Sequence, residues 1–337
     1  MRSAAAEAEA RDLLRRLATP PGALGGLGDL AVELAGIAGV CPPPLPEPAA
    51  VAVFAGDHGV VAQGVTPWPS EVTASMVATM CAGRAAVNAL ARQVGAEVVV
   101  VDVGVAGDLP PHPLLRDRKV VRGTRDLATG PAMTAAEADA ARSVGAEVAR
   151  ELVAGGARLL VTGDMGIGNT TPSAAVIAAL TGRPAAACTG RGTGIDDATL
   201  ARKTSVVEGA VARVAGAGPE EVLAEVGGLE IAALAGFVAA GVAARVPVVV
   251  DGVITLAAVL VAEAMAPGTV TGCIAGHRST EPGALVALDH LGLGPLLDLE
   301  LRLGEGSGAC LAVPVVQSAA RLLREVATLD AVVPVRT

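Results

Sequence analysis

Aromatic residues are nearly absent from this 337-residue chain, which has no Tyr, two Phe (Phe54 and Phe237) and one Trp (Trp68). Without them the chain lacks the platform on which the bases of single-stranded nucleic acids usually stack. The net charge of −9 also excludes the basic stripe with which nucleic-acid-binding proteins neutralise phosphates. We therefore expect no nucleic-acid partner.

Cysteine and histidine are scarce and widely spaced. The five cysteines include no CxxC pair, and the four histidines include no HExxH or other close ligand pair. An odd, unclustered set of cysteines is typical of buried, reduced thiols in a cytoplasmic protein, and not of a disulfide framework or a zinc site. We expect a cytoplasmic protein without a structural metal.

Long hydrophobic runs are missing too, although just over half of the residues are apolar. The longest uncharged apolar run, 231–244, is rich in Ala and Gly and is shorter than the roughly 20 residues that a membrane-spanning helix needs. The first residues alternate charged side chains with Ala and Leu, which indicates an amphipathic helix and not a secretory signal. We expect no membrane span.

What is present is Ala, Val and Leu in short runs, each followed by a Gly- or Asp-rich loop and an Ala-rich helical stretch. Nearly continuous apolar runs are typical of strands buried on both faces. Their alternation with helices predicts an α/β fold, with a Rossmann-like parallel sheet flanked by helices. Strands are predicted at Val51–Ala55, Glu97–Val101, Arg158–Val161, Val246–Val250 and Val270–Ala275, and a weaker one at Ala185–Cys188.

The two chain ends carry helical patterns of their own. Residues 1 to about 40 have helical patterning, and a proline-rich linker follows at Cys41–Pro48. Beyond Pro314 the chain returns to a helical pattern, from Ala319 to Ala327. We therefore predict a small helical domain made from residues 1–48 and 314–337, around an α/β catalytic domain at 49–313.

Ligands of parallel sheets bind beyond the carboxyl ends of the strands, where this chain has several glycine-rich loops. Gly163–Thr171 contains glycines, an Asn and two Thr just before a helical run that starts near Pro172. A glycine-rich turn that leads into a helix N-terminus suits an anion, although an ordinary capped helix gives the same pattern. The loop matches neither Walker A nor GxGxxG.

Lys203 follows a second such loop, Gly190–Asp197, and is one of two lysines among 25 basic residues. A compact ammonium suits a phosphate oxygen, whereas a lone lysine is more often exposed to solvent. Glu305 stands between Gly304 and Gly306, ahead of an apolar helical segment. Partial burial there raises a carboxyl pKa towards the range of a general base; the alternative is a carboxylate that interacts with the helix dipole.

Trp68 lies between two prolines, which hold the indole rigidly as a stacking surface for a flat ring, or as a plug over the sheet edge. Asp57 and His58 could form a catalytic pair, but a buried His satisfied by its neighbours is the favoured interpretation. Asp251 and His277 are expected to organise their loops.

Six segments together resemble the nicotinate-nucleotide–dimethylbenzimidazole phosphoribosyltransferases, which make the lower nucleotide of cobalamin. The resemblance implies a Rossmann-like domain, a small helical domain from both chain ends and a homodimer. It also implies transfer of the phosphoribosyl group of nicotinate mononucleotide to 5,6-dimethylbenzimidazole, with inversion at C1′ and without a cofactor or metal. The segments, in family order, are Asp57–Val60, Val65–Thr73, Gly163–Thr171, Gly190–Asp197, Gly276–Pro282 and Arg302–Gly308.

The resemblance also assigns residues. It makes Glu305 the general base, places Lys203, Ser279 and 166–170 at the phosphate, and places Trp68 on a segment that lines the base pocket. Asp164 stands where many relatives have Glu. The substrate-binding set predicted in this way is Trp68, Asp164, Gly166, Ile167, Gly168, Asn169, Thr170, Gly192, Thr193, Lys203 and Ser279.

Other functions remain open at this point. A sister transferase would use another acceptor, such as adenine, benzimidazole or a phenol, and would differ near Trp68, Met76 and Met80. A non-catalytic nucleotide sensor on the same fold is disfavoured by Glu305, because a binder needs no carboxylate facing C1′. An NAD-dependent dehydrogenase is disfavoured because no GxGxxG follows the first strand.

Overall fold

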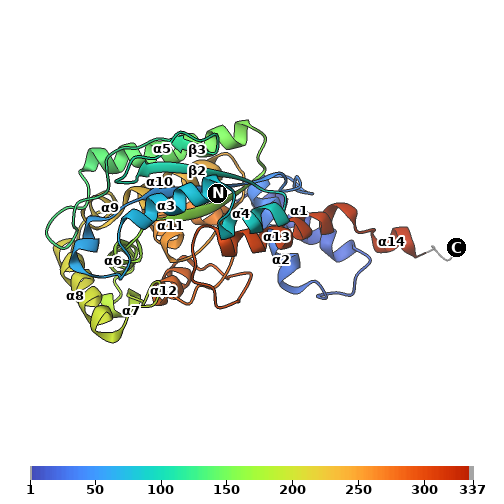
Figure 1. Ribbon diagram of the computed structural model, residues 1–337. Helices are drawn as coiled ribbons and strands as arrows, with labels where there is room; N and C mark the ends of the chain where they lie inside the picture. Colours follow the sequence, from blue (N-terminus) through green and yellow to red (C-terminus); the bar gives the residue numbers. More distant parts are fainter. Residues whose placement is uncertain (1, 334–337) are drawn as a thin grey trace.

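The computed structural model describes residues 2–333 and builds them around one six-stranded, fully parallel sheet (Figure 1). The strand order is β3-β2-β1-β4-β5-β6, which changes direction between β1 and β4. In such sheets a crevice opens at that switch point, beyond the carboxyl ends of the strands. The predicted α/β class is confirmed. The strands are β1 Ala49–Gly56, β2 Glu97–Gly104, β3 Leu115–Asp117, β4 Leu159–Met165, β5 Val248–Val250 and β6 Cys273–Ala275.

The five main strand predictions are confirmed in place, with bounds that shift by a few residues. The weaker prediction at Ala185–Cys188 is wrong, because these residues form a short helix, α7. Three alanines directly after Pro184 favour a helical turn, since Ala has the highest helix propensity and Pro suits a helix start. The edge strand β3 was not predicted, because two of its three residues are charged and no apolar run marks it.

Side chains of the sheet alternate between two separate cores. On β1, Ala52 and Phe54 face one core while Val51 and Val53 face the other. Phe54 meets Phe237 of the first core edge to face, with ring centroids 5.4 Å apart. The first core is covered by α5 (Ala135–Ala154), α6 (Thr170–Thr181), α8 (Asp197–Arg213), α9 (Pro219–Val226), α10 (Leu229–Ala243), α11 (Val253–Met265) and α12 (Pro282–Leu291).

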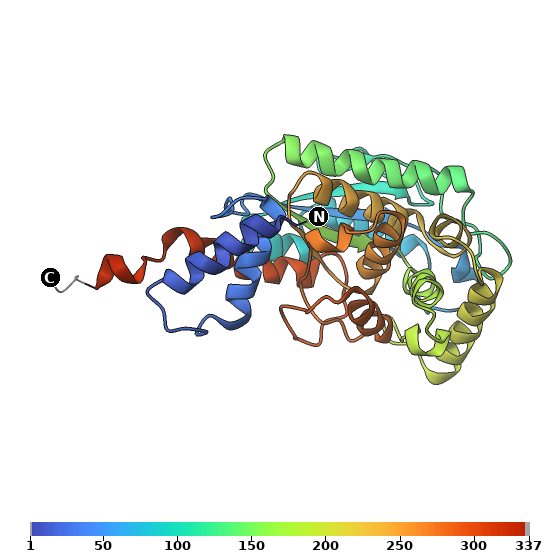
Figure 2. The same ribbon diagram turned by 180° about the vertical axis from the view of Figure 1, so that it is seen from behind.

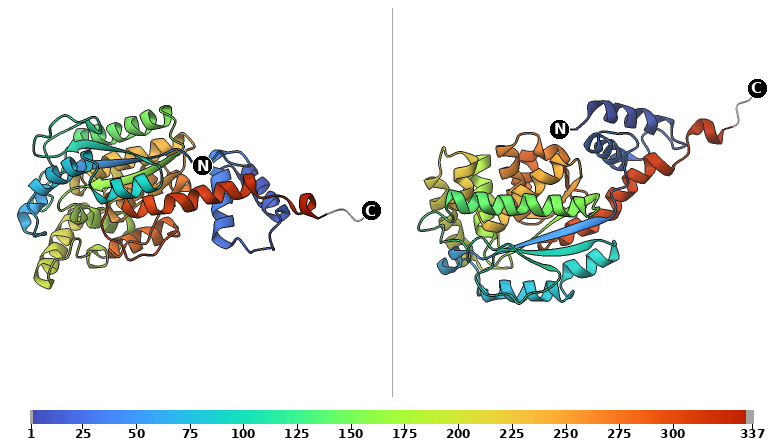
Figure 3. Two further views of the ribbon diagram at one scale, coloured as in Figure 1. Left: turned by 45° about the vertical axis from the view of Figure 1, so that its right-hand side comes forward. Right: turned by 90° about the horizontal axis from the view of Figure 1, so that it is seen from above.

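The second core lies under α3 (Glu71–Cys81) and α4 (Ala86–Gln93) and extends to the helices of the two chain ends. These are α1 (Ala4–Arg16), α2 (Gly25–Ala38) and α13 (Ser307–Glu325). Figure 3 shows α13 running from the α/β body to α1 and α2, against which it packs. The short α14 (Leu329–Val332) follows and projects from the body (Figure 2). One-turn 3-10 helices stand at Gly59–Gln63 and Thr269–Gly272.

α13 corrects one expectation. We placed a domain boundary at residue 314, but Pro314 lies inside a single helix. A proline removes one intrahelical hydrogen bond, and here the packing of buried neighbours such as Cys310 and Val313 holds the helix together. The boundary predicted at residue 314 therefore falls within a helix, and the division into domains stays a prediction. Residues 1 and 334–337 of the two terminal segments lie outside the described residues.

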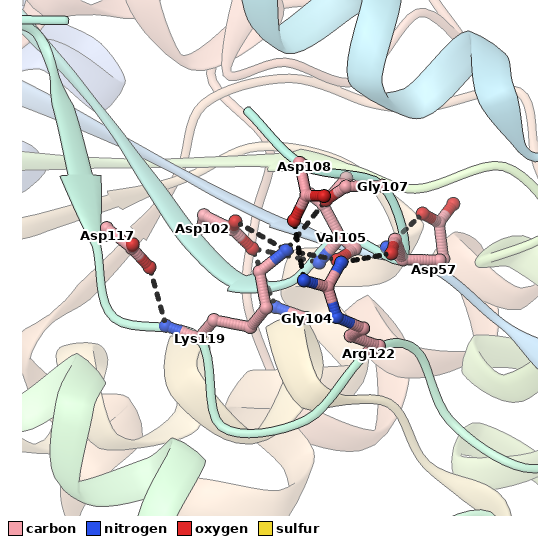
Figure 4. A network of polar contacts seen from close by, with 10 residues as sticks. Asp57, Asp102, Gly104, Val105, Gly107, Asp108, Asp117, Lys119 and Arg122 are labelled. Carbon is pink, nitrogen blue, oxygen red and sulfur yellow. Dashed lines mark hydrogen bonds and ion pairs between the residues drawn. The ribbon is translucent and has the colours of Figure 1, made fainter. Parts of the chain in front are cut away.

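The segment after β2 is fixed by two cations (Figure 4). The Lys119 ammonium lies 3.1 Å from Oδ2 of the buried Asp102, and it donates hydrogen bonds to the carbonyls of Val105 and Gly107. Arg122 donates from Nη1 to the Ala106 carbonyl at 2.9 Å. Together these bonds hold residues 104–108 against the body of the sheet. Among residues 2–333, no helix is both long and apolar enough to cross a membrane.

The Lys119–Asp102 pair yields a stability prediction. Lys119→Met leaves the Asp102 carboxylate, which is 2% exposed, without its cation. Burial already raises the pKa of Asp102 even beside Lys119. We expect the free energy of unfolding, measured by urea denaturation, to fall by about 3 kcal/mol. The double variant Lys119→Met/Asp102→Asn should recover most of this loss, and a single variant as stable as the natural protein would contradict the prediction.

Candidate active site

One pocket lies at the switch point of the sheet, beyond the carboxyl ends of the strands. All the residues of the predicted substrate-binding set line it, although they come from segments far apart in the sequence. Their individual roles stay predictions. They are Trp68, Asp164, Gly166, Ile167, Gly168, Asn169, Thr170, Gly192, Thr193, Lys203 and Ser279. Lining residues that the sequence analysis left out include Arg191, Gly252, Val253, Glu281, Arg302 and Leu303.

The β4–α6 loop forms one wall of the pocket. α6 starts at Thr170, slightly before the start expected near Pro172, and its N-terminal end lies at the pocket. The positive end of the helix dipole therefore faces the ligand space. The loop is anchored from outside, because the Ile167 N–H donates to Thr73 Oγ1 of α3 at 3.1 Å. Such a preformed wall suits a phosphate.

Lys203 enters the pocket from α8 and is 1% exposed, so the solvent-exposed alternative is wrong. Its Nζ donates to Thr170 Oγ1 at 2.7 Å and to the Gly190 carbonyl at 3.0 Å. An ammonium has three N–H groups, so one is left to point at a ligand. Burial lowers the pKa of Lys203 to about 8, although the Glu281 carboxylate works in the opposite direction.

The glycine-rich loop after α7 is clamped from two sides. The carboxylate of Glu281 accepts a hydrogen bond from the Gly192 N–H at 2.8 Å. Arg302 donates from Nη1 to the Gly192 carbonyl at 2.6 Å. The sequence analysis missed both residues, and the only signal was their position within two of the six family-like segments. A loop held at both its N–H and its carbonyl keeps one backbone geometry at the pocket wall.

Asp164, the last but one residue of β4, lines the pocket. Its Oδ2 accepts a hydrogen bond from Asn169 Nδ2 at 2.9 Å, while Oδ1 has no partner within residues 2–333. Burial raises the pKa of Asp164 well above its usual value, and the nearby carboxylates of Asp251, Glu230 and Glu305 raise it further. These effects favour the protonated acid, which could donate a hydrogen bond to a ligand hydroxyl.

Glu305 occupies an unusual backbone turn. Its φ is +64°, between Gly304 at +81° and Gly306 at +89°, and a non-glycine residue pays about 1–2 kcal/mol for this left-handed conformation. Asp251 holds the turn, because its carboxylate accepts the Gly306 N–H at 3.2 Å and the Ala309 N–H at 2.9 Å. His277 Nε2 lies 3.4 Å from the same carboxylate. Asp251, with His277 beside it, thus holds the turn of Glu305, whereas the sequence indicated a role within their own loops.

The Glu305 carboxylate is 5% exposed, and Oε2 accepts a hydrogen bond from the Val87 N–H at 3.3 Å. The dipole contact that the sequence left open is therefore with the start of α4 and not with α13. Burial raises the pKa of Glu305, as does the charge of Asp251, while the Val87 hydrogen bond lowers it. Gly304 lines the pocket, whereas Glu305 is not one of the lining residues.

Trp68 and His58 take different positions. Trp68 is 50% exposed and lines the pocket, so its indole is available to a flat ligand. His58 is buried behind the pocket, and its Nε2 lies 2.9 Å from Glu230 Oε1. His58 is buried, as expected, but it is not fully satisfied by its neighbours, because Nδ1 has no hydrogen-bond partner within residues 2–333.

Comparison with known proteins relates this pocket to a family. A family model described as "Phosphoribosyltransferase" matches residues 1–333. The nicotinate-nucleotide–dimethylbenzimidazole phosphoribosyltransferase of Salinispora tropica is 58% identical over 341 residues, covering 96% of this chain and 94% of the relative. The enzyme of that name from Thermus thermophilus is 51% identical, covering 94% of each chain. This chain belongs to the nicotinate-nucleotide–dimethylbenzimidazole phosphoribosyltransferase family.

A solved structure of the family agrees. The crystal structure of CobT from Thermus thermophilus matches with a TM-score of 0.94 and 50% sequence identity, covering 96% of this chain and 97% of the other. The chain is thus a phosphoribosyltransferase, a glycosyl-transferring enzyme, as the resemblance implied. Five of the six family-like segments line the pocket, and the sixth, Asp57–Val60, packs behind it.

Proposed function

We propose that this phosphoribosyltransferase moves the phosphoribosyl group of nicotinate mononucleotide to 5,6-dimethylbenzimidazole, in the synthesis of the cobalamin nucleotide loop. The products are α-ribazole 5′-phosphate and nicotinate. The observation that carries the proposal is the convergence of an anion-binding wall, the buried Lys203 and the buried carboxyl of Asp164 around one pocket at the sheet switch point, with Glu305 next in sequence to the lining residue Gly304. The names of the related enzymes agree with it.

In the proposed complex the 5′-phosphate lies at the N-terminus of α6, where Lys203, Thr170 and Ser279 line the pocket. The remaining N–H of the Lys203 ammonium donates to a phosphate oxygen, which makes a strong, charge-assisted hydrogen bond. The indole of Trp68 offers a stacking surface for a flat ring at the pocket mouth.

The reaction then needs one base. One ring nitrogen of the acceptor attacks C1′ while its other nitrogen gives its proton to the Glu305 carboxylate. The bond between C1′ and the pyridinium nitrogen breaks, and its electron pair returns to the ring, so nicotinate leaves without a general acid. The negative charge of the Glu305 carboxylate also stabilises the cationic transition state. In this scheme the acceptor reaches Glu305 by displacing the 3.3 Å hydrogen bond from Val87.

The proposal includes a homodimer in the cytoplasm that acts on small molecules. Leu329, Val332 and Val333 are exposed on the projecting end of the chain, which gives an apolar surface for a second copy to cover. The five cysteines are free thiols, as a reducing compartment permits. The net charge of −9 supports the absence of a nucleic-acid partner.

Product analysis tests the proposed reaction. Purified protein is incubated with nicotinate mononucleotide and, separately, dimethylbenzimidazole, benzimidazole, adenine and a phenol. We expect release of nicotinate together with the α-ribotide, fastest with dimethylbenzimidazole. Faster turnover with another acceptor would show that this acceptor is the substrate. It would also indicate that the Trp68 side of the pocket sets the choice of acceptor. Nucleotide binding without any turnover would contradict the proposed reaction and favour a sensor.

A further inference from the structure

A buried charge pair lies behind the nucleotide pocket and has no part in the proposed chemistry. His58 follows β1, and Glu230 stands in the first turn of α10, 172 positions later in the sequence. Both side chains are 0% exposed, and His58 Nε2 lies 2.9 Å from Glu230 Oε1. Burying two ionisable groups is costly unless they compensate each other. Such a pair therefore calls for a reason beyond packing.

The pair touches the pocket through glycine backbones. A Cβ placed on Gly166 would lie 3.2 Å from His58 Nε2, and it would collide with the Gly56 carbonyl. A Cβ on Gly228 would lie 2.6 Å from His58 Cε1 and 2.7 Å from Glu230 Oε2. The backbone thus approaches the imidazole closely from two sides. Gly166 itself lines the pocket, directly ahead of the α6 N-terminus.

The charges around His58 all favour its protonated form. Burial alone would lower the pKa of His58, but the Glu230 carboxylate and, more weakly, Asp57 outweigh burial and raise it. Asp57 comes from the same loop, Glu230 comes from α10, and the neighbouring Gly166 adds no charge. Asp164, at the end of β4, faces Glu230, whose charge raises the pKa of Asp164. The pair therefore also influences the ionisation of a residue in the pocket.

We propose that His58 and Glu230 form a positioning pair, which fixes the backbone at Gly166 and so sets the affinity of the pocket for its nucleotide. The inference rests on the proposed function in taking nicotinate mononucleotide as that nucleotide. The pair does not touch the reacting atoms. Its loss lets the β4–α6 loop move relative to Lys203, and a misplacement of about 1 Å can cost up to roughly 100-fold in a well-organised site.

Trp68 makes the test direct. It is the only tryptophan of a chain without tyrosine and it lines the pocket, so its fluorescence reports nucleotide binding without any need for turnover. In Glu230→Gln we expect the Kd for nicotinate mononucleotide to rise about tenfold, with kcat at saturation changed by less than about threefold. The double variant His58→Gln/Glu230→Gln forms a neutral hydrogen-bonded pair and should recover most of the affinity.

Lys119→Met is the matched control, because it removes the partner of another buried carboxylate without touching the β4–α6 loop. It is expected to lose stability while its Kd stays within about twofold of the natural value. An unchanged Kd in Glu230→Gln would overturn the inference, as would an equal weakening in Lys119→Met. If the natural protein bound neither the nucleotide nor inorganic phosphate, the proposed function would fail first, before any variant is compared.

A measurement on the natural protein covers the case in which Glu230→Gln does not fold. The chain has four histidines, so ¹⁵N-histidine labelling gives a simple spectrum of imidazole signals. We expect the His58 signal to shift on saturation with nicotinate mononucleotide, although His58 does not line the pocket. The reason is that Gly166 lines the pocket and also lies against the His58 imidazole. A His58 signal that stays in place while Trp68 reports binding would overturn the inference.

Discussion

Replacing Glu305 by Gln is expected to lower kcat about 1,000-fold, the middle of the range that a general base contributes. The amide has the same shape and its oxygen can still accept the Val87 N–H, so the turn should keep its geometry. Nucleotide binding, followed by Trp68 fluorescence, should change by less than about threefold, because the proposed phosphate contacts come from Lys203 and the β4–α6 loop. Steady-state kinetics with dimethylbenzimidazole supplies the rate.

Glu300→Gln is the matched control for this variant. Glu300 also has a positive φ, of +55°, but it is exposed and does not line the pocket. It should keep its natural rate. The pH profile adds a second check, since burial raises the pKa of Glu305 and the base works only when deprotonated. The acidic limb of kcat should therefore lie above the usual range of a glutamate. A Glu305→Gln enzyme within about tenfold of the natural rate would exclude this residue as the base.

Lys203→Met is expected to weaken the binding of nicotinate mononucleotide about 100-fold, as the loss of a buried, charge-assisted phosphate contact implies. The same substitution should leave the binding of the phosphate-free nicotinate riboside nearly unchanged, which makes the riboside a control on the ligand side. Titration of Trp68 fluorescence measures both ligands. An equal loss for riboside and mononucleotide would show that the variant distorts the pocket and does not remove a phosphate contact.

The pKa of Lys203 gives this prediction a pH dependence. Burial lowers that pKa to about 8, so the ammonium is charged below pH 8 and loses its proton as the pH rises through this value. Affinity for the dianionic phosphate should therefore be highest below about pH 8 and decline above it. The decline should be absent in Lys203→Met. A natural protein whose affinity stays constant up to about pH 10 would contradict the role of Lys203.

The sheet could be predicted from the sequence because buried parallel strands are short, nearly continuous apolar runs with little else to imitate them. Where that signal failed, the reason is physical. β3 has two charged residues and forms only because β2 offers it an edge. The apolar residues of α7 were predicted as a strand, although three alanines after Pro184 favour a helical turn. The domain boundary predicted at residue 314 falls inside α13, because one helix continues through Pro314.

Some residues of the candidate site could also be predicted from the sequence, and others could not. The segment Gly166–Thr170 and Glu305 could be predicted because they lie in local glycine-rich patterns, which indicate an unusual backbone. Lys203 could be predicted because lysine is rare in this chain and this one follows a glycine-rich loop. Their partners could not be predicted, since a hydrogen bond such as that from Val87 to Glu305 joins residues 218 positions apart. Such partners have no local signature, because an ordinary helix start looks the same whether or not a distant carboxylate reaches it. Only the fold identifies them.

α13 connects the turn of Glu305 with the helices of the chain's N-terminal segment. Its first residue follows Glu305 by two positions, and its far half packs against α1 and α2 (Figure 3). A helix of 19 residues is a stiff rod roughly 28 Å long, so a tilt at one end displaces the other. A shift of α1 and α2 would therefore be passed along α13 to the strained turn that carries the proposed base. A partner or a fused tag that displaces these terminal helices should therefore also shift the carboxylate of Glu305.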